Sequence, residues 1–274
     1  MTIFQSILLG LVQGLTEFLP ISSSGHLVII PYLLGWDIPA ATAFIFDVLV
    51  QVATLAAVIG YFWKDLVAIA KAMLSDLWHK QPFRSQDSRL GWLILLACVP
   101  AGIAGIIIKD IVEAAFASPI ATAFFLFGTA ILLFIAEKLG SRKRELADTN
   151  WIDAIWVGFF QALAIFPGLS RSGATISGGM LRNLQRPAAA RFSFLMSIPI
   201  MLAAGLLAGV DLVQMPNVTD QLLVFIPGFI TAAVTGYLTI RWLLGYLTRR
   251  PLYVFSIYCA VMAALTILVY FVRR

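Results

Sequence analysis

Long apolar blocks alternate with short polar segments along most of the chain. Six of the blocks are about as long as a helix needs to be to cross ~30 Å of hydrocarbon. They are Phe44–Trp63, Leu90–Ile108, Ala121–Ala136, Phe192–Val210, Leu222–Leu244 and Leu252–Val272. Shorter apolar pieces come in two pairs, Thr2–Leu19 with His26–Leu34 and Trp151–Phe166 with Ala174–Leu184. The pattern predicts an all-α integral membrane protein with about six transmembrane helices and two pairs of shorter helices.

A polar turn interrupts each short pair. Trp151–Phe166 would be about 24 Å long as a helix, which is less than a full crossing, and it runs into the helix-stopping pair Pro167-Gly168. Pro20–Gly25 (PISSSG) interrupts the first pair in the same way. Non-helical backbone is tolerated at membrane depth only where protein buries it or where it lines a water-filled cavity. We therefore expect two re-entrant hairpins, each of which enters and leaves on the same side.

The two interrupted pairs are copies of one motif. GLVQGLTEFLPISSSG (Gly10–Gly25) placed over GFFQALAIFPGLSRSG (Gly158–Gly173) gives seven identities in sixteen positions, where chance composition would give roughly one. Three apolar blocks follow each motif, so the organisation repeats as well. The predicted units are a first repeat at 1–139, a cytoplasmic linker at 140–150 and a second repeat at 151–274.

A hairpin plus three crossings is an odd number of crossings for each half. The second half is therefore expected to be inverted relative to the first, so that the two polar turns approach from opposite faces and meet near the midplane. Many transporters share this plan.

Composition and charge agree with the membrane assignment. The chain is 61% hydrophobic and 12% charged, with a mean hydropathy of +0.93, which excludes an ordinary soluble domain. The net charge of +5 comes from basic residues in the polar loops, at 64–89, 142–144, 182–191 and 249–250. By the positive-inside rule these loops are cytoplasmic, whereas Gly35–Ala43 and Asp211–Asp220 are external. The basic residues thus indicate topology and no nucleic-acid partner. The first apolar stretch lacks a basic n-region and a cleavage site, so it is expected to belong to the fold.

The first motif carries an acid inside the membrane. Glu17 lies near the deep end of the first short helix, where a carboxylate costs a few kcal/mol or more and is a functional candidate by default. Gln13, four residues earlier, shares its helical face. His26 follows Ser22 and Ser23 closely enough to share the start of the next helix. Accidental exposure of Glu17 to water at the hairpin tip is the alternative interpretation.

The second motif carries one cation among small polar residues. Arg171 lies between Ser170 and Ser172 and is followed by Gly173 and Thr175. A guanidinium donates two parallel hydrogen bonds to phosphate, and glycine with a helix N-terminus lets backbone amides approach an anion. The motif therefore favours phosphate binding. The alternative is an internal ion pair with Glu17 that bridges the two hairpins.

Both motifs resemble the signatures of the undecaprenyl pyrophosphate phosphatases, the bacitracin-resistance family. QGLTEFLPISSSGH at Gln13–His26 is similar to the first signature and PGLSRSGATISGG at Pro167–Gly179 to the second, and length and span pattern fit from end to end. The resemblance implies an enzyme of the bacterial plasma membrane that removes the terminal phosphate of undecaprenyl diphosphate and so recycles the lipid carrier for peptidoglycan synthesis. It also implies a site open to the external or periplasmic side and a divalent cation, Mg²⁺ or Ca²⁺, as cofactor.

The resemblance also assigns roles to individual residues. Glu17 matches the motif glutamate, Ser23 the candidate nucleophile and His26 the motif histidine. The implied phosphate-binding set is Ser22, Ser170, Arg171, Ser172, Gly173 and Thr175. Glu17 and Gln13 are the implied metal ligands, and Gln13 stands where many members have a second glutamate, so it should hold a metal more weakly.

Two questions stay open at this level. Ser23 could attack phosphorus with His26 or Glu17 as base, or the same groups could activate water directly. An inverted-repeat transporter or flippase for an anionic lipid or solute is the alternative function, with Arg171 binding the anion and Glu17 coupling to ions. The expected partners are a polyprenyl diphosphate and membrane lipid, with a homodimer as one option for assembly.

Overall fold

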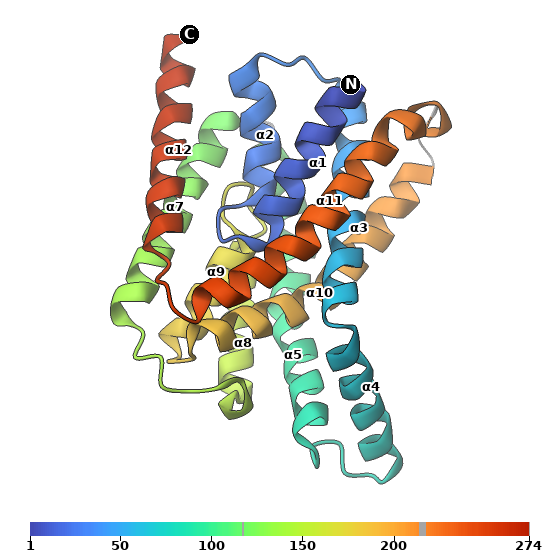
Figure 1. The fold of residues 1–274 in the computed structure, drawn as a ribbon, viewed down its shortest axis with the longest axis vertical. Coiled ribbons are helices and arrows are strands. Elements are labelled where there is room, and N and C mark those ends of the chain that lie inside the picture. The colour runs from blue at the N-terminus through green and yellow to red at the C-terminus, as the bar shows by residue number, and fades with distance from the viewer. Residues whose placement is uncertain (117, 214–217, 274) are drawn as a thin grey trace.

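A computed structural model describes residues 1–116, 118–213 and 218–273 as a bundle of helices (Figure 1). The helices are α1 (Ile3–Phe18), α2 (Ser23–Leu34), α3 (Ala40–Tyr61), α4 (Trp63–Trp78), α5 (Gln86–Ile107), α6 (Lys109–Phe116), α7 (Pro119–Leu139), the 3-10 helix η1 (Leu146–Asp148), α8 (Trp151–Leu163), α9 (Arg171–Leu181), α10 (Arg186–Val213), α11 (Val218–Leu247) and α12 (Tyr253–Val272). The predicted all-α fold class is confirmed.

Six helices of the described residues are long and apolar enough to cross a membrane. They are Ala40–Tyr61, Gln86–Ile107, Pro119–Leu139, Arg186–Leu207, Leu223–Leu247 and Tyr253–Val272. Large apolar side chains such as Leu206, Leu223 and Val254 are exposed on their outer faces, as expected for lipid-facing positions. The chain is a multi-pass membrane protein, and each predicted block corresponds to one of these helices. Part of the predicted external segment Asp211–Asp220 lies outside the described residues.

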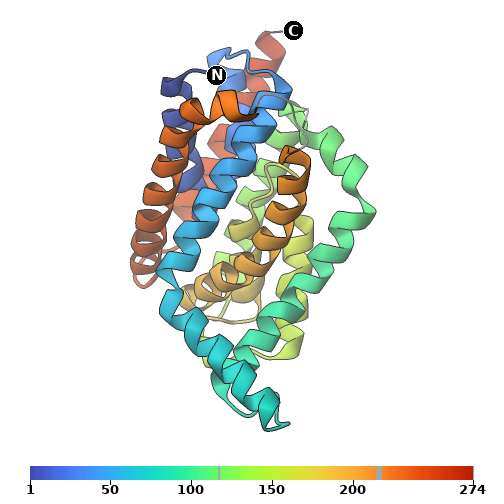
Figure 2. The same ribbon diagram turned by 90° about the vertical axis from the view of Figure 1, so that its right-hand side faces the viewer.

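The basic segment 64–89 is more structured than its charge suggested. It was expected to be a loop, but it contains α4, which packs on α5 and buries Ile69. Asp76 closes the connection, because its carboxylate accepts hydrogen bonds from the Ser85 hydroxyl (2.7 Å) and the Ser85 backbone N–H (2.8 Å). Figure 2 shows this hairpin, in teal, extending beyond the rest of the bundle. The loop was predicted because lysines on the exposed side of an amphipathic helix resemble a charged loop in sequence.

The short helices pack against the opposite half of the chain. α1 packs mainly along α11, and α8 packs mainly along α5. Corresponding glycines of the repeat make both approaches close: a Cβ on Gly10 would lie 2.2 Å from the Gly228 carbonyl oxygen, and one on Gly158 would lie 2.6 Å from the Ala97 carbonyl oxygen. In Figure 1 α1 and α2 occupy the upper part of the bundle, and α8 and α9 lie below them. This arrangement is consistent with inverted halves that carry re-entrant hairpins.

The second helix of each pair begins earlier than predicted. Ser22 caps α2 by accepting a hydrogen bond from Gly25 N–H at 3.2 Å. Ser170 caps α9 in the same way through Gly173 N–H at 3.0 Å. A serine at this position satisfies a backbone donor that would otherwise be unpaired. As a result Ser23 and Arg171 lie in the first turns of helices and not in the preceding turns.

Buried ion pairs fix the linker to the second hairpin. Asp153, at the start of α8, binds Arg144 of the linker (2.5 Å) and Arg182 at the end of α9 (2.6 Å). Glu137, at the end of α7, binds Arg142 and Arg186. Because both carboxylates are almost completely buried, loss of both arginine partners of either one would leave an uncompensated charge.

Candidate active site

The two polar turns touch each other. Turn 1 (residues 19–22) joins α1 to α2, and turn 2 (residues 164–170) joins α8 to α9. Just beyond turn 2, the Ser172 hydroxyl donates a hydrogen bond to the Leu19 carbonyl at 2.9 Å. A Cβ on Gly25 would lie 3.0 Å from Gly168 Cα. The two motifs therefore meet, as the repeat predicted.

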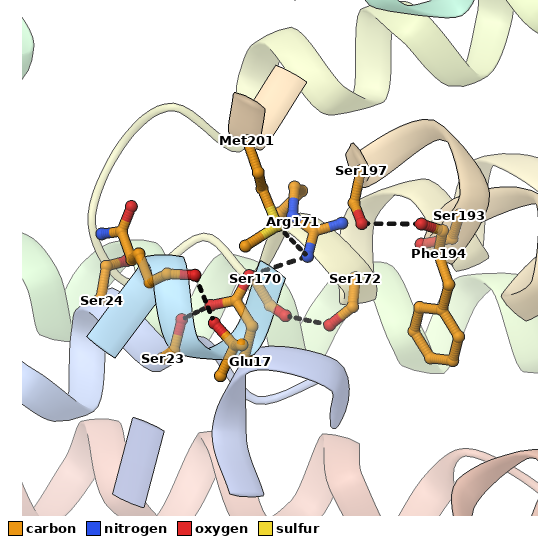
Figure 3. A network of polar contacts seen from close by, with 12 residues as sticks. Glu17, Ser23, Ser24, Ser170, Arg171, Ser172, Ser193, Phe194, Ser197 and Met201 are labelled. Carbon is orange, nitrogen blue, oxygen red and sulfur yellow. Dashed lines mark hydrogen bonds and ion pairs between the residues drawn. The ribbon is translucent and has the colours of Figure 1, made fainter. Parts of the chain in front are cut away.

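Glu17 is the centre of this meeting point. Its Oε1 accepts a hydrogen bond from Arg171 Nη2 at 2.8 Å, and its Oε2 accepts one from Ser23 Oγ at 2.5 Å and one from Gln13 Nε2 at 3.1 Å. Figure 3 shows Glu17, Ser23 and Arg171 pointing toward one another. The ion pair that the sequence left as an alternative is thus formed, and it joins the acid of one motif to the cation of the other. Water is largely excluded, since the Glu17 side chain is 9% exposed and that of Arg171 is 16% exposed.

Two polar atoms at this centre are buried without a hydrogen-bond partner among the described residues. They are Arg171 Nη1 and Gln13 Oε1. Gln13 uses its Nε2 on both Glu17 and Thr54, the latter at 3.3 Å. Buried polar atoms nearly always have a partner, so both atoms mark places where a ligand would complete the hydrogen bonding. A free guanidinium N–H suits a phosphate oxygen.

Ser170 of turn 2 and the Ser172 and Thr175 hydroxyls of α9 mainly hold the backbone. Ser170 Oγ caps α9 and lies 3.2 Å from Ser172 Oγ, which in turn binds turn 1. The Thr175 hydroxyl donates to the Arg171 carbonyl (2.8 Å) and contacts Ser193 Oγ (2.6 Å). Of the predicted phosphate-binding set, Arg171 is therefore the residue with a buried free donor, while these hydroxyls hold it in place.

Thr129 of α7 supports turn 2, and sequence reasoning missed it. Its hydroxyl accepts a hydrogen bond from Ser170 N–H and donates one to the Gly168 carbonyl, both at 2.9 Å. Gly168 has a φ of +95°, a conformation that glycine adopts without penalty. Thr129 lies inside an apolar block, where nothing local distinguishes it from a packing residue.

His26 lies apart from the Glu17 carboxylate. It is buried; its Nδ1 lies 2.7 Å from the Ser22 carbonyl and its Nε2 lies 2.7 Å from the Tyr258 hydroxyl. Both ring nitrogens are thus engaged by groups other than Ser23 and Glu17. Tyr258 was also missed from the sequence, because it lies 232 positions away in the last apolar block.

The residues predicted to bind a metal offer one carboxylate and one free amide oxygen. Among the described residues no group of three His, Cys, Asp or Glu side chains could hold an ion. Mg²⁺, however, is usually bound by one or two carboxylates together with waters and substrate phosphates. Glu17 and the Oε1 of Gln13 fit a cation of that kind, which shares its ligands with a bound diphosphate.

Comparison with known proteins decides the family. The family model of the bacitracin resistance protein BacA matches residues 6–265. The chain belongs to this family. It is 44% identical to the undecaprenyl-diphosphatase of Moorella thermoacetica over 274 residues, which are all of both chains. It is 39% identical to that of Thermomicrobium roseum, with 98% of each chain covered, and 43% identical to that of Chlorobaculum parvum, with 93% and 92% covered.

Proposed function

We infer that the chain is a membrane-bound hydrolase that removes the terminal phosphate of undecaprenyl diphosphate and releases undecaprenyl phosphate. Its relatives over the full length carry that name. The observation that carries the inference is the buried Nη1 of Arg171, a free phosphate donor beside the hydrogen-bonded pair of Ser23 and Glu17. The transporter reading explains the ion pair but gives no reason for a serine hydroxyl aimed at its carboxylate.

Arg171 would bind the diphosphate. Its guanidinium lies at the N-terminus of α9, where the helix dipole adds to the attraction of an anion. Since Nη2 already binds Glu17, Nη1 is the arm that takes the phosphate oxygen. Neutralising the oxygens of the transferred group and holding it in line is most of what phosphoryl transfer requires.

Ser23 would be the nucleophile and Glu17 its base. Ser23 Oγ already donates to Glu17 Oε2 at 2.5 Å, so its proton passes to the carboxylate as the oxygen attacks the terminal phosphorus. The bond from phosphorus to the bridging oxygen breaks, undecaprenyl phosphate leaves, and water then hydrolyses the phosphoserine. In the alternative route the same carboxylate activates water directly. His26 is the weaker candidate for the base, because both of its nitrogens are occupied.

A divalent cation, Mg²⁺ or Ca²⁺, would be held by Glu17 and Gln13. When bound, it supplies positive charge that offsets the diphosphate and stabilises the transition state. The free Oε1 of Gln13 supports this assignment.

The prenyl tail would leave the site sideways into lipid. An apolar cavity of about 350 Å³ lies between α1 and α11, lined by Leu15, Leu19, Leu238 and Trp242 among others. Leu19 belongs to turn 1, and its carbonyl binds Ser172, so this cavity begins beside the candidate site. The protein would lie in the bacterial plasma membrane with the site open to the external side, because the segments that flank α1 and α2 carry no Lys or Arg.

The test is release of phosphate by protein purified in detergent. We expect release from a prenyl diphosphate, its loss with EDTA and its return with Mg²⁺ or Ca²⁺. The matching prenyl monophosphate serves as the control and should release none. A protein that binds the diphosphate but releases no phosphate would support the transporter instead.

A further inference from the structure

Tyr258 connects the last helix, α12, to the start of α2, the helix that carries the candidate nucleophile. Its hydroxyl lies 2.7 Å from His26 Nε2, and the two rings stack with centroids 5.6 Å apart and planes 9° apart. The next residue, Cys259, contacts turn 1, with Sγ 3.7 Å from the Pro20 carbonyl. Two consecutive residues of α12 therefore contact the start of α2 and the turn before it.

The contacts of His26 define its protonation. A carbonyl oxygen can only accept, so the nitrogen that faces the Ser22 carbonyl, Nδ1, carries a hydrogen. In the neutral ring Nε2 is then the acceptor, and the Tyr258 hydroxyl is its donor. The Ser22 carbonyl thus decides which nitrogen carries the hydrogen, and Tyr258 holds the orientation of the ring.

The Ser22 carbonyl is held at a strained residue. Ser22 has a φ of 70° and a ψ of 100°, a conformation that residues with a Cβ adopt at a cost of about 1–3 kcal/mol. Its carbonyl accepts hydrogen bonds from both the Nδ1 and the backbone N–H of His26, the latter at 3.2 Å. Ser22 immediately precedes Ser23, so its backbone angles decide where the Ser23 hydroxyl points.

Turn 2 has a comparable support. Thr129 of α7 holds it by hydrogen bonds to Gly168 and Ser170, and α7 and α12 pack side by side (Figure 1). Each turn is thus supported by the last long helix of the opposite half. The support of turn 1 differs in that it passes through an imidazole.

We propose that Tyr258 is a positioning residue of the reaction: through His26 it holds the Ser22 backbone so that Ser23 can donate to Glu17. The proposal rests on the proposed function. Tyr258 itself touches neither the reacting serine nor the carboxylate in this assignment; it acts through His26.

Tyr258→Phe tests it, because this change removes only the hydroxyl and keeps the stacked ring. We expect kcat for prenyl diphosphate hydrolysis to fall about tenfold, the loss of one hydrogen bond of ordinary strength, with KM within about twofold. Tyr253→Phe on the same helix is the matched control and should retain full kcat. Binding stoichiometry for a non-hydrolysable methylene diphosphonate analogue measures the fraction of folded sites and should stay unchanged.

A double-mutant cycle tests the route through His26. In His26→Asn the amide nitrogen can replace Nδ1 as donor to Ser22, but the contact with Tyr258 is lost. We expect Tyr258→Phe to have no further effect in this background. Additive losses, a lowered binding stoichiometry that accounts for the fall in kcat, or full kcat in Tyr258→Phe would each overturn the proposal. Absence of phosphate release by the unmodified protein would instead refute the proposed function, and this inference with it.

Discussion

Turn 1 and turn 2 come from the same repeated motif, yet they carry different chemistry. Both keep the serine that caps the following helix, Ser22 in one and Ser170 in the other, with nearly equal cap distances of 3.2 and 3.0 Å. The second copy has Ile165 where the first has Glu17, and Arg171 where the first has Ser23. The shared positions preserve a helix start at membrane depth, while the divergent positions separate an acid with a nucleophile candidate from a phosphate-binding cation.

The charged residues of the two copies depend on each other for neutralisation. The Glu17 carboxylate, buried between the turns, is neutralised by a cation from the other copy. Neither hairpin alone could keep its charged residue in the membrane at low cost. The ion pair is therefore part of the assembly of the two halves as well as of the candidate site.

The largest expected effect comes from removing the hydroxyl of the candidate nucleophile. Ser23→Ala should lower phosphate release at least about 1,000-fold if Ser23 is the nucleophile. Ser24→Ala, one residue on, is the control and should stay within a few-fold of the unmodified protein, since among the described residues its hydroxyl has a hydrogen-bond contact with Ser22 alone, at 3.4 Å. Near-normal turnover by Ser23→Ala would eliminate the phosphoserine route and leave direct attack by water.

Arg171→Lys removes the planar guanidinium at the start of α9 that is proposed to bind phosphate. A lysine keeps the charge but cannot bind Glu17 and a phosphate oxygen through two planar N–H groups, so we expect release to fall about 100-fold. Arg249→Lys, at an exposed position after α11, should leave activity unchanged. If Arg171→Lys were fully active, the two-armed role of the guanidinium would be refuted.

Gly168→Ala should show how tightly the backbone of turn 2 is constrained. A Cβ there would lie 2.1 Å from the Thr122 carbonyl oxygen, at a φ of +95°, so the free energy of unfolding should drop by at least about 2 kcal/mol. Thermal unfolding in detergent measures this drop. Gly245→Ala, whose Cβ would meet no described atom within 4 Å outside its chain neighbours and its own helix backbone, should be neutral or slightly stabilising; equal behaviour of both variants would contradict the constraint.

Gln13→Glu tests the assignment of a metal to Gln13 and Glu17 of α1. A second carboxylate beside Glu17 should lower the Mg²⁺ concentration that gives half-maximal release severalfold, because cation affinity rises with ligand charge. The measurement is a Mg²⁺ titration after EDTA treatment. Gln161→Glu, the matching change in the second motif, should leave that concentration unchanged, and an equal shift in both variants would argue against a cation at Glu17.

Filling the cavity beside turn 1 should give the smallest effect. Leu238→Trp narrows the apolar cavity between α1 and α11, and we expect KM for the long undecaprenyl substrate to rise severalfold while that for a short prenyl diphosphate stays the same. Ile103→Trp, in the apolar cavity between α5 and α8 near the second hairpin, is the control. If KM for the long substrate rose in Ile103→Trp and not in Leu238→Trp, the prenyl tail would be assigned to the cavity between α5 and α8 instead.

The membrane fold and several residues of the candidate site could be predicted from the sequence alone. Six apolar blocks of spanning length predicted the six candidate spans, because hydrophobicity at that length is a local property of the chain. The repeated motif predicted that the segments around Glu17 and Arg171 meet, because an odd number of crossings inverts the second half. Helix α4 was not predicted, since an amphipathic helix with an exposed basic side resembles a charged loop in sequence.

The contacts that distinguish candidate reacting residues from residues that support them became visible only in the tertiary structure. Gln13 and Glu17 could be proposed from their spacing and Ser23 from the family resemblance, but the contact of His26 with Tyr258 and that of Ser170 with Thr129 join residues far apart in the chain. Tyr258 and Thr129 lie in apolar blocks whose local pattern specifies only burial. Hydrogen-bond partners at such separations depend on how the helices pack. For this physical reason a motif can identify His26 as a candidate but cannot predict the residue that it contacts.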